Sequence, residues 1–230
     1  MGLADRRLYL CTPDRPDLGA FVAACIAGGV DIVQLRDKHL EARPLLARAA
    51  VVRAVCADAG VPFILNDRPD LALEAGADGV HVGQDDAPVA LARRILGDEA
   101  IIGLSTHGPA DLAGAMESAG DLSYISAGPV EPTPTKPGRP GTGLEYLTQA
   151  TPAAGAGAAG AGAMPVFVTG GVTPEKIPLL AGAGARHFVV VRYLTEAADP
   201  RRAARLLRDA IDAIDAIDAH DGVDAVDAVS

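Results

Sequence analysis

Short β-branched runs alternate with longer Ala- and Leu-rich segments along almost the whole chain. Runs of this kind, bounded by turn residues, are typical of buried strands, and the longer segments between them are typical of amphipathic helices. The predicted strands cover residues 8–11, 31–35, 62–65, 79–82, 101–104, 123–126, 165–168 and 187–191. The predicted helices cover residues 17–28, 41–59, 69–76, 88–96, 109–119, 143–150, 174–183 and 199–214.

Eight strands that are each followed by a helix predict an α/β protein, a single-domain TIM (β/α)₈ barrel. A doubly wound sheet is the alternative, but so many units of near-equal length favour the closed barrel. The phrase Ala-Gly-Ala at 75–77 returns at 183–185, and each copy indicates a helix that ends at glycine before the next strand. The length of 230 residues suits one barrel domain.

Two segments depart from this rhythm, and they set the domain boundaries. Residues 153–163 contain only Ala and Gly, which predicts a flexible surface loop within a barrel domain of residues 1–208. The loop contains Gly155-x-Gly157-x-x-Gly160, but no β-branched strand precedes it, so a dinucleotide site is not predicted. Residues 209–230 repeat Asp every third position. A period of three drifts around a helix, so we expect residues 209–230 to be an acidic tail, either the fraying end of the last helix or disordered.

The acidic tail also changes how the net charge is interpreted. Seven of the ten net negative charges lie in residues 209–230, which leaves −3 for the barrel. A mildly acidic body without a basic stripe argues against nucleic acid as a partner. No apolar run is long enough to cross a membrane, and the N-terminus lacks a secretory signal. Three cysteines without metal-ligand spacing predict free thiols in a reducing cytoplasm.

Cations and carboxylates follow several predicted strands, where a barrel builds its active site. Asp67 and Asp86 suit Mg²⁺, which takes one or two protein carboxylates and completes its shell with water and phosphate. Arg36, Lys38 and Lys136 could hold the remaining phosphate oxygens, although simple salt bridges with the carboxylates are the alternative. The set predicts a metal-bound pyrophosphate, with Ser105 and Thr135 as neutral donors.

Gly170-Gly171 predicts a second anion site, because barrels often bind phosphate after strands 7 and 8 with backbone N–H groups. A tight turn alone would also explain the two glycines. No Ser-His-Asp set can be assembled, and His107 is interpreted as a polar loop residue rather than as a general base. The inventory suits a reaction with a good leaving group and a positioned nucleophile.

The order of these motifs resembles the thiamine phosphate synthase family over about residues 6–200. The motifs that carry the resemblance are Gln34-Leu35-Arg36-Asp37-Lys38, Asn66-Asp67, His81-x-Gly83-Gln84-x-Asp86, Gly103-x-Ser105, Thr133-x-Thr135-Lys136 and Gly170-Gly171. The resemblance implies a transferase that joins hydroxymethylpyrimidine diphosphate to a thiazole phosphate, or to its carboxylate form. Thiamine phosphate and pyrophosphate would be released after a dissociative, carbocation-like substitution.

The resemblance also implies a role for each matching residue. Asp67 and Asp86 would hold one Mg²⁺ per subunit, and Arg36, Lys38, Ser105 and Lys136 would be catalytic. These four would also bind the pyrimidine diphosphate, together with Gln34 and Asn66. The thiazole phosphate would contact Thr133, Thr135, Gly171, Val191 and Arg192. The expected partners are small molecules, and assembly into a homo-oligomer is left open.

Three positions depart from the family pattern around the thiazole phosphate. Arg192 stands where Ser is usual, Lys176 where Asn is usual, and Thr169 where Ile is customary. Our hypothesis is that Arg192 contacts the thiazole phosphate, or a carboxylate on a thiazole variant. Two alternatives to the synthase are a thiazole tautomerase-like barrel and a non-catalytic barrel that binds a phosphate ligand.

Overall fold

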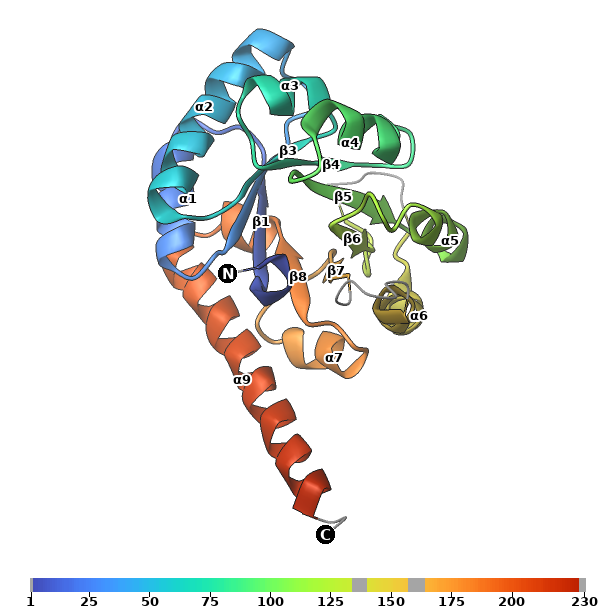
Figure 1. Cartoon of the computed structure of the whole chain (residues 1–230). Coiled ribbons are helices and arrows are strands. Elements are labelled where there is room, and N and C mark those ends of the chain that lie inside the picture. Colours follow the sequence, from blue (N-terminus) through green and yellow to red (C-terminus); the bar gives the residue numbers. More distant parts are fainter. Residues whose placement is uncertain (1, 134–139, 157–163, 228–230) are drawn as a thin grey trace.

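A computed structural model describes residues 2–133, 140–156 and 164–227 of the chain (Figure 1). Eight parallel strands form a closed barrel in the order β1 to β8, with β8 pairing back onto β1, which confirms the predicted fold. The strands are β1 (Leu8–Thr12), β2 (Ile32–Leu35), β3 (Phe63–Asn66), β4 (Gly79–Val82), β5 (Ile101–Thr106), β6 (Tyr124–Ala127), β7 (Val166–Val168) and β8 (His187–Val190).

Helices surround the barrel on its outer face (Figure 1). They are α1 (Leu18–Ala27), α2 (Ala42–Ala59), α3 (Pro69–Glu74), α4 (Val89–Leu96), α5 (Pro109–Glu117), α6 (Gly143–Ala156), α7 (Ile177–Gly182), α8 (Arg192–Thr195) and α9 (Pro200–Asp227), with a 3₁₀ turn, η1 (Leu3–Asp5), before the first strand. Gly76 and Gly184 follow α3 and α7 with φ of 60° and 95°, as the repeated Ala-Gly-Ala phrase predicted. None of the helices in the described ranges is long and apolar enough to cross a membrane.

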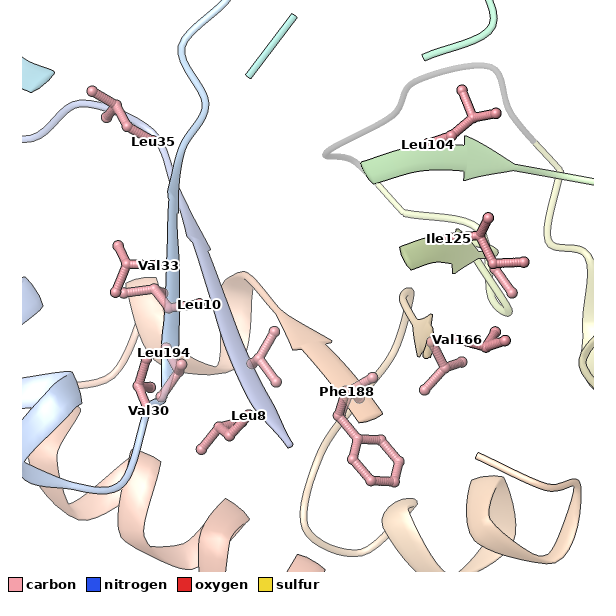
Figure 2. Close-up of a cluster of buried hydrophobic side chains, with 14 of the residues drawn as sticks. Leu8, Leu10, Val30, Val33, Leu35, Leu104, Ile125, Val166, Phe188 and Leu194 are labelled. Atoms are coloured by element: carbon pink, nitrogen blue, oxygen red, sulfur yellow. The ribbon is translucent and has the colours of Figure 1, made fainter. Parts of the chain in front are cut away.

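The strands are buried on both faces, which explains their nearly continuous apolar runs. One face packs under the helices, where Leu8, Leu10, Val33 and Phe188 belong to a single large cluster (Figure 2). The other face fills the inside of the barrel. This inner cluster consists of Tyr9, Ile32, Ile64, Tyr124 and Phe167.

A glycine on β5 makes room for Tyr124, one of the two tyrosines of that inner cluster. A Cβ atom at Gly103 would lie 2.1 Å from the Tyr124 ring, far inside van der Waals contact. Tyr124 on β6 is therefore able to lie across the barrel interior only because β5 has no side chain at that level.

Two segments differ from the prediction. Residues 153–156 were predicted to be loop, but they form the last turn of α6; alanine is a strong helix former and Ala154 is buried. Residues 157–163 of that predicted loop lie outside the described residues. Residues 209–230 were predicted to be a helix end or a disordered tail; as far as Asp227 they are helix, because α9 continues to that residue, and its last part extends away from the barrel (Figure 1).

The first part of the acidic segment packs against the rest of the protein, which the triplet repeat did not predict. Ile211 and Ile214 are buried, and the Asp215 carboxylate accepts two hydrogen bonds of 2.7 Å from the Arg7 guanidinium. The drift of a three-residue period is nevertheless visible, since Ile217 is 59% exposed. The short helix α8, directly after β8, was not predicted.

Candidate active site

A pocket of about 770 Å³ opens at the carboxyl ends of the eight strands. Nearly all the residues that the sequence singled out line it. They are Gln34, Arg36, Lys38, Asn66, Asp67, Asp86, Ser105, Thr133, Gly171, Val191 and Arg192. The other two, Thr135 and Lys136, lie outside the described residues. The parallel barrel thus brings together side chains from loops that are far apart in the sequence.

One side of the pocket is a pair of carboxylates beside a cation. Asp67 follows β3 with φ of 65°, and its backbone N–H donates to the His81 carbonyl oxygen at 2.8 Å. The Gly83 N–H fixes Asp86 by donating to its Oδ2 at 2.8 Å. The Lys38 Nζ lies 2.8 Å from Asp67 Oδ2. Burial raises the pKa of Asp67, and the neighbouring Asp86 carboxyl raises it further, while Lys38 lowers it.

Opposite the carboxylates, two glycines meet the loop that follows β6. Gly170 and Gly171 have φ of 93° and 78°, a left-handed conformation that side chains disfavour. A Cβ atom at Gly171 would lie 2.5 Å from the Glu131 carboxylate. That carboxylate is held by the Lys176 Nζ at 2.5 and 2.6 Å, so an ion pair links the loops after β6 and β7.

Arg192 lies exposed at the first residue of α8, on the same side of the pocket as the two glycines. His107 also lines the pocket, and its Nδ1 is 2.9 Å from the Asp111 Oδ2. Asp111 follows His107 by only four residues, so the contact fixes the imidazole ring locally, as expected for a histidine in a loop.

The floor of the pocket is a buried chain of polar side chains that joins the predicted residues Gln34 and Ser105 through two tyrosines that the sequence did not indicate. Gln34 Nε2 donates to the Tyr9 Oη at 2.8 Å, and the two tyrosine hydroxyls are 2.9 Å apart. The Tyr124 Oη lies 2.9 Å from His81 Nδ1, and His81 Nε2 lies 2.9 Å from Ser105 Oγ. Burial raises the pKa of both tyrosines, so both are un-ionised phenols.

In the sequence alone, Tyr9 and Tyr124 look like ordinary aromatic residues of buried strands. A signal does exist in the alternation of strand side chains. Tyr9 and Cys11 are two apart on β1, and Tyr124 and Ser126 are two apart on β6, so each pair shares a face with the polar residues of the pocket.

These features define a class of protein: a single-domain (β/α)₈ barrel with a charged, polar pocket over the carboxyl ends of its strands, the usual place for catalysis in this architecture. A family model described as thiamine monophosphate synthase matches residues 8–194. The chain belongs to the thiamine monophosphate synthase family, and it is an enzyme of the transferase class.

Relatives with curated names support this assignment along the whole barrel. The chain is 48% identical over 226 residues to a thiamine-phosphate synthase of Arthrobacter sp., covering 91% of this chain and 95% of the relative. It is 45% identical over 221 residues to a thiamine-phosphate synthase of Mycobacterium bovis, covering 91% and 96%. Among solved structures, thiamine phosphate pyrophosphorylase from Pyrococcus furiosus aligns with a TM-score of 0.77 at 26% identity, covering 90% of this chain and 96% of that one.

Proposed function

We propose that this chain joins hydroxymethylpyrimidine diphosphate to a thiazole phosphate, with Mg²⁺, to give thiamine phosphate and pyrophosphate. The observation that carries the proposal is the pair Asp67 and Asp86 beside Lys38, at the edge of a pocket in a member of this family. A diphosphate needs cations, and this edge offers both a fixed ammonium and two oxygen donors for a metal.

The residues present fit a magnesium ion. The neighbouring Asp86 carboxyl raises the pKa of Asp67, and a bound divalent cation would offset the repulsion between the two carboxylates. Mg²⁺ needs only one or two protein carboxylates, because water and phosphate oxygens complete its shell. When bound, Mg²⁺ neutralises negative charge on the departing pyrophosphate.

The chain's own residues would bind and orient both substrates. Arg36 and Lys38, together with Lys136, hold the diphosphate oxygens while the bond between the pyrimidine methylene carbon and the diphosphate oxygen breaks. The electron pair leaves with pyrophosphate, and the thiazole nitrogen lone pair then forms the new carbon–nitrogen bond. The thiazole nitrogen already carries a free lone pair, so no proton has to be removed from the nucleophile. Orientation of the two substrates contributes roughly 7–11 kcal/mol at best.

The thiazole end would lie against Gly171, with Thr133, Thr135 and Val191 around it. Arg192 lines this side of the pocket and is exposed, so its guanidinium is available for a phosphate or a carboxylate. We assign to Arg192 a contact with the thiazole phosphate, or with the carboxylate of a carboxylated thiazole. The three cysteines are buried thiols, which suits a reducing compartment such as the cytoplasm.

The test is an assay of purified protein with Mg²⁺ and both substrates, in which pyrophosphate and thiamine phosphate are followed together. We expect both products in equal amounts, and no turnover after EDTA treatment until Mg²⁺ is restored. Asp67→Asn should abolish turnover, whereas Asp70→Asn, which alters an exposed ion pair with Arg68 outside the pocket, should not. Lys136→Ala should also abolish turnover.

Other results would assign the chain to one of the alternatives. Isomerisation of a thiazole phosphate without pyrophosphate release would identify a tautomerase-like barrel. Saturable binding of either substrate without any product would identify a non-catalytic phosphate-binding barrel.

A further inference from the structure

The buried polar chain beneath the pocket consists of groups that each have few hydrogens to donate. It crosses the barrel interior from β2 through β1 and β6 to β4 and β5. A phenol has one hydrogen, and a neutral imidazole has one N–H and one acceptor nitrogen. Leaving a buried hydrogen without an acceptor costs free energy, so once the first donor is fixed, the donor of every later hydrogen bond in the chain follows.

The Gln34 end fixes the first donor. Gln34 Nε2 donates to Tyr9 Oη, and the Cys11 thiol lies 3.3 Å from Gln34 Oε1 as its donor. The opposite amide orientation would direct the NH₂ group at a thiol sulfur, which is a weak acceptor. Since Tyr9 accepts from Gln34, its single hydrogen donates to Tyr124 Oη at 2.9 Å.

The same reasoning assigns the donors of the remaining hydrogen bonds, from Tyr124 to the pocket. The hydroxyl of Tyr124 already accepts from Tyr9, so it donates to His81 Nδ1. His81 then carries its hydrogen on Nε2 and donates it to Ser105 Oγ. A phenol hydroxyl donating to an imidazole nitrogen is also the more favourable pairing, because the phenol is the stronger acid and the imidazole the stronger base.

The consequence falls on Ser105. Its oxygen accepts from His81 at 2.9 Å, and the Ser126 hydroxyl donates to it at 3.5 Å. The hydrogen of Ser105 is then not used within the chain, and Ser105 lines the pocket. We propose that Tyr124 and His81 are positioning residues that hold Ser105 as a hydrogen-bond donor toward the substrate. This step rests on the proposed function, in which Ser105 contacts the pyrimidine diphosphate.

Packing keeps the chain in this arrangement. The His81 and Tyr124 rings stack with centroids 5.5 Å apart, and Tyr124 meets Phe167 edge-on at 5.2 Å. Gly103 provides the space that the Tyr124 ring occupies. Tyr9 and Tyr124 are fully buried, so water does not compete for their hydroxyls.

The reverse direction would give Ser105 the opposite chemistry. If His81 carried its hydrogen on Nδ1, its Nε2 would accept from Ser105, and Ser105 could offer only lone pairs to the substrate. The two directions thus differ in one measurable property, the tautomer of neutral His81. That tautomer can be determined in the protein without substrate.

The first experiment is a long-range ¹H–¹⁵N correlation spectrum of the full chain at pH 8, where an ordinary imidazole is neutral. The His81 signals are assigned by their loss in His81→Asn. We expect the Nε2–H tautomer, and a Nδ1–H tautomer overturns the proposal. In Gln34→Glu, a carboxylate at position 34 accepts from Tyr9 and reverses the chain, so the Nδ1–H tautomer is expected there.

The second experiment compares Tyr124→Phe with Thr106→Val. Both remove one buried hydroxyl, but Thr106 donates to the Ser126 carbonyl and does not line the pocket. We expect Tyr124→Phe to lose the pure Nε2–H signature and to lower kcat about two- to tenfold, the loss that corresponds to one neutral hydrogen bond. KM for both substrates should change less than twofold, because the donated bond strengthens as charge develops on the leaving group.

Each remaining outcome has one interpretation. Unchanged kcat and an unchanged tautomer in Tyr124→Phe overturn the positioning role, and so does an equal loss of kcat in Thr106→Val. A wild-type protein with the Nε2–H tautomer but no synthase activity contradicts the proposed function and leaves the direction of the hydrogen-bond chain established.

Discussion

Two properties of Asp67 lower the stability of the folded protein: a left-handed backbone conformation and a largely buried charge. It is the non-glycine residue with positive φ in the described part of the chain, and its carboxylate is only 19% exposed beside Asp86. Asparagine adopts this backbone conformation readily and carries no charge. We therefore predict that metal-free Asp67→Asn is inactive yet more stable than the wild type, with Tm higher by roughly 2–4 °C, which corresponds to about 1 kcal/mol.

The pH dependence of that difference follows from the raised pKa of Asp67. Between its unfolded and folded pKa values the folded state binds more protons, so wild-type stability falls as pH rises through this window. Below the unfolded pKa, near 3.9, both states are protonated and the Asp67 charge contributes nothing. The Tm advantage of Asp67→Asn should therefore be largest at neutral pH and should vanish toward pH 4. An advantage that is constant with pH would contradict burial of the charge as its cause.

Arg192 gives a second prediction at the scale of one residue. If its guanidinium contacts the anionic end of the thiazole, Arg192→Ser should raise the KM for the thiazole phosphate about tenfold or more, the loss expected for a hydrogen bond to a charged group. The KM for the pyrimidine diphosphate should be unchanged. An unchanged or lower KM for the thiazole phosphate would remove Arg192 from that site.

Between elements, the Glu131–Lys176 pair controls the charge next to the glycine turn. The Glu131 carboxylate lies against Gly171, where the proposed phosphate would bind, and Lys176 neutralises it. Lys176→Ala should expose that negative charge and raise the KM for the thiazole phosphate about two- to fivefold, a small effect because the pair is partly exposed. The effect should shrink at 0.5 M salt.

The double variant Glu131→Gln, Lys176→Gln is the control for this prediction. It removes both charges but keeps side chains of similar size in both loops. Its KM should return to within twofold of the wild type. A KM as high as that of Lys176→Ala would instead indicate that the ion pair holds the two loops together mechanically.

The elements themselves could largely be predicted from the sequence, since β-branched runs fixed each strand to within about two residues. The departures occur where tertiary contacts override local pattern. Composition alone suggested a loop at 153–156, but Ala154 packs into the core; the Asp triplets suggested disorder, but Ile211 and Ile214 pack against the barrel helices. The short helix α8 carries no periodic signal because it has only one turn.

Only part of the candidate site could be predicted from the sequence. Charged residues directly after strands are visible in one dimension, and Arg36, Lys38, Asp67 and Asp86, which were predicted on that basis, line the pocket. The hydrogen-bond chain through Tyr9 and Tyr124 depends on which strands face each other across the barrel. That relation is a property of the closed sheet, and no local motif records it.

At the scale of the whole molecule, α9 secures the closure of the barrel beside β8 and β1. Its first half packs against α1 and α7 (Figure 1), and Asp215 forms an ion pair with Arg7, just before β1. A chain that ends at Asp209 should lose about 4 kcal/mol or more, because two buried isoleucines are removed. A chain that ends at Ile217 keeps all three contacts and should unfold within about 2 °C of the full chain. Thermal unfolding of the two truncations checks this, and equal losses would contradict it.

Gly103 and Tyr124 have a consequence for how such a sequence can change over generations. Any side chain at 103 collides with the Tyr124 ring, and a smaller residue at 124 with Gly103 retained leaves a hole in the barrel. Each single change is harmful, whereas a joint exchange of volume between the two strands would be tolerated. We therefore expect the two residues to change together, because a protein with only one of the two changes would be less stable.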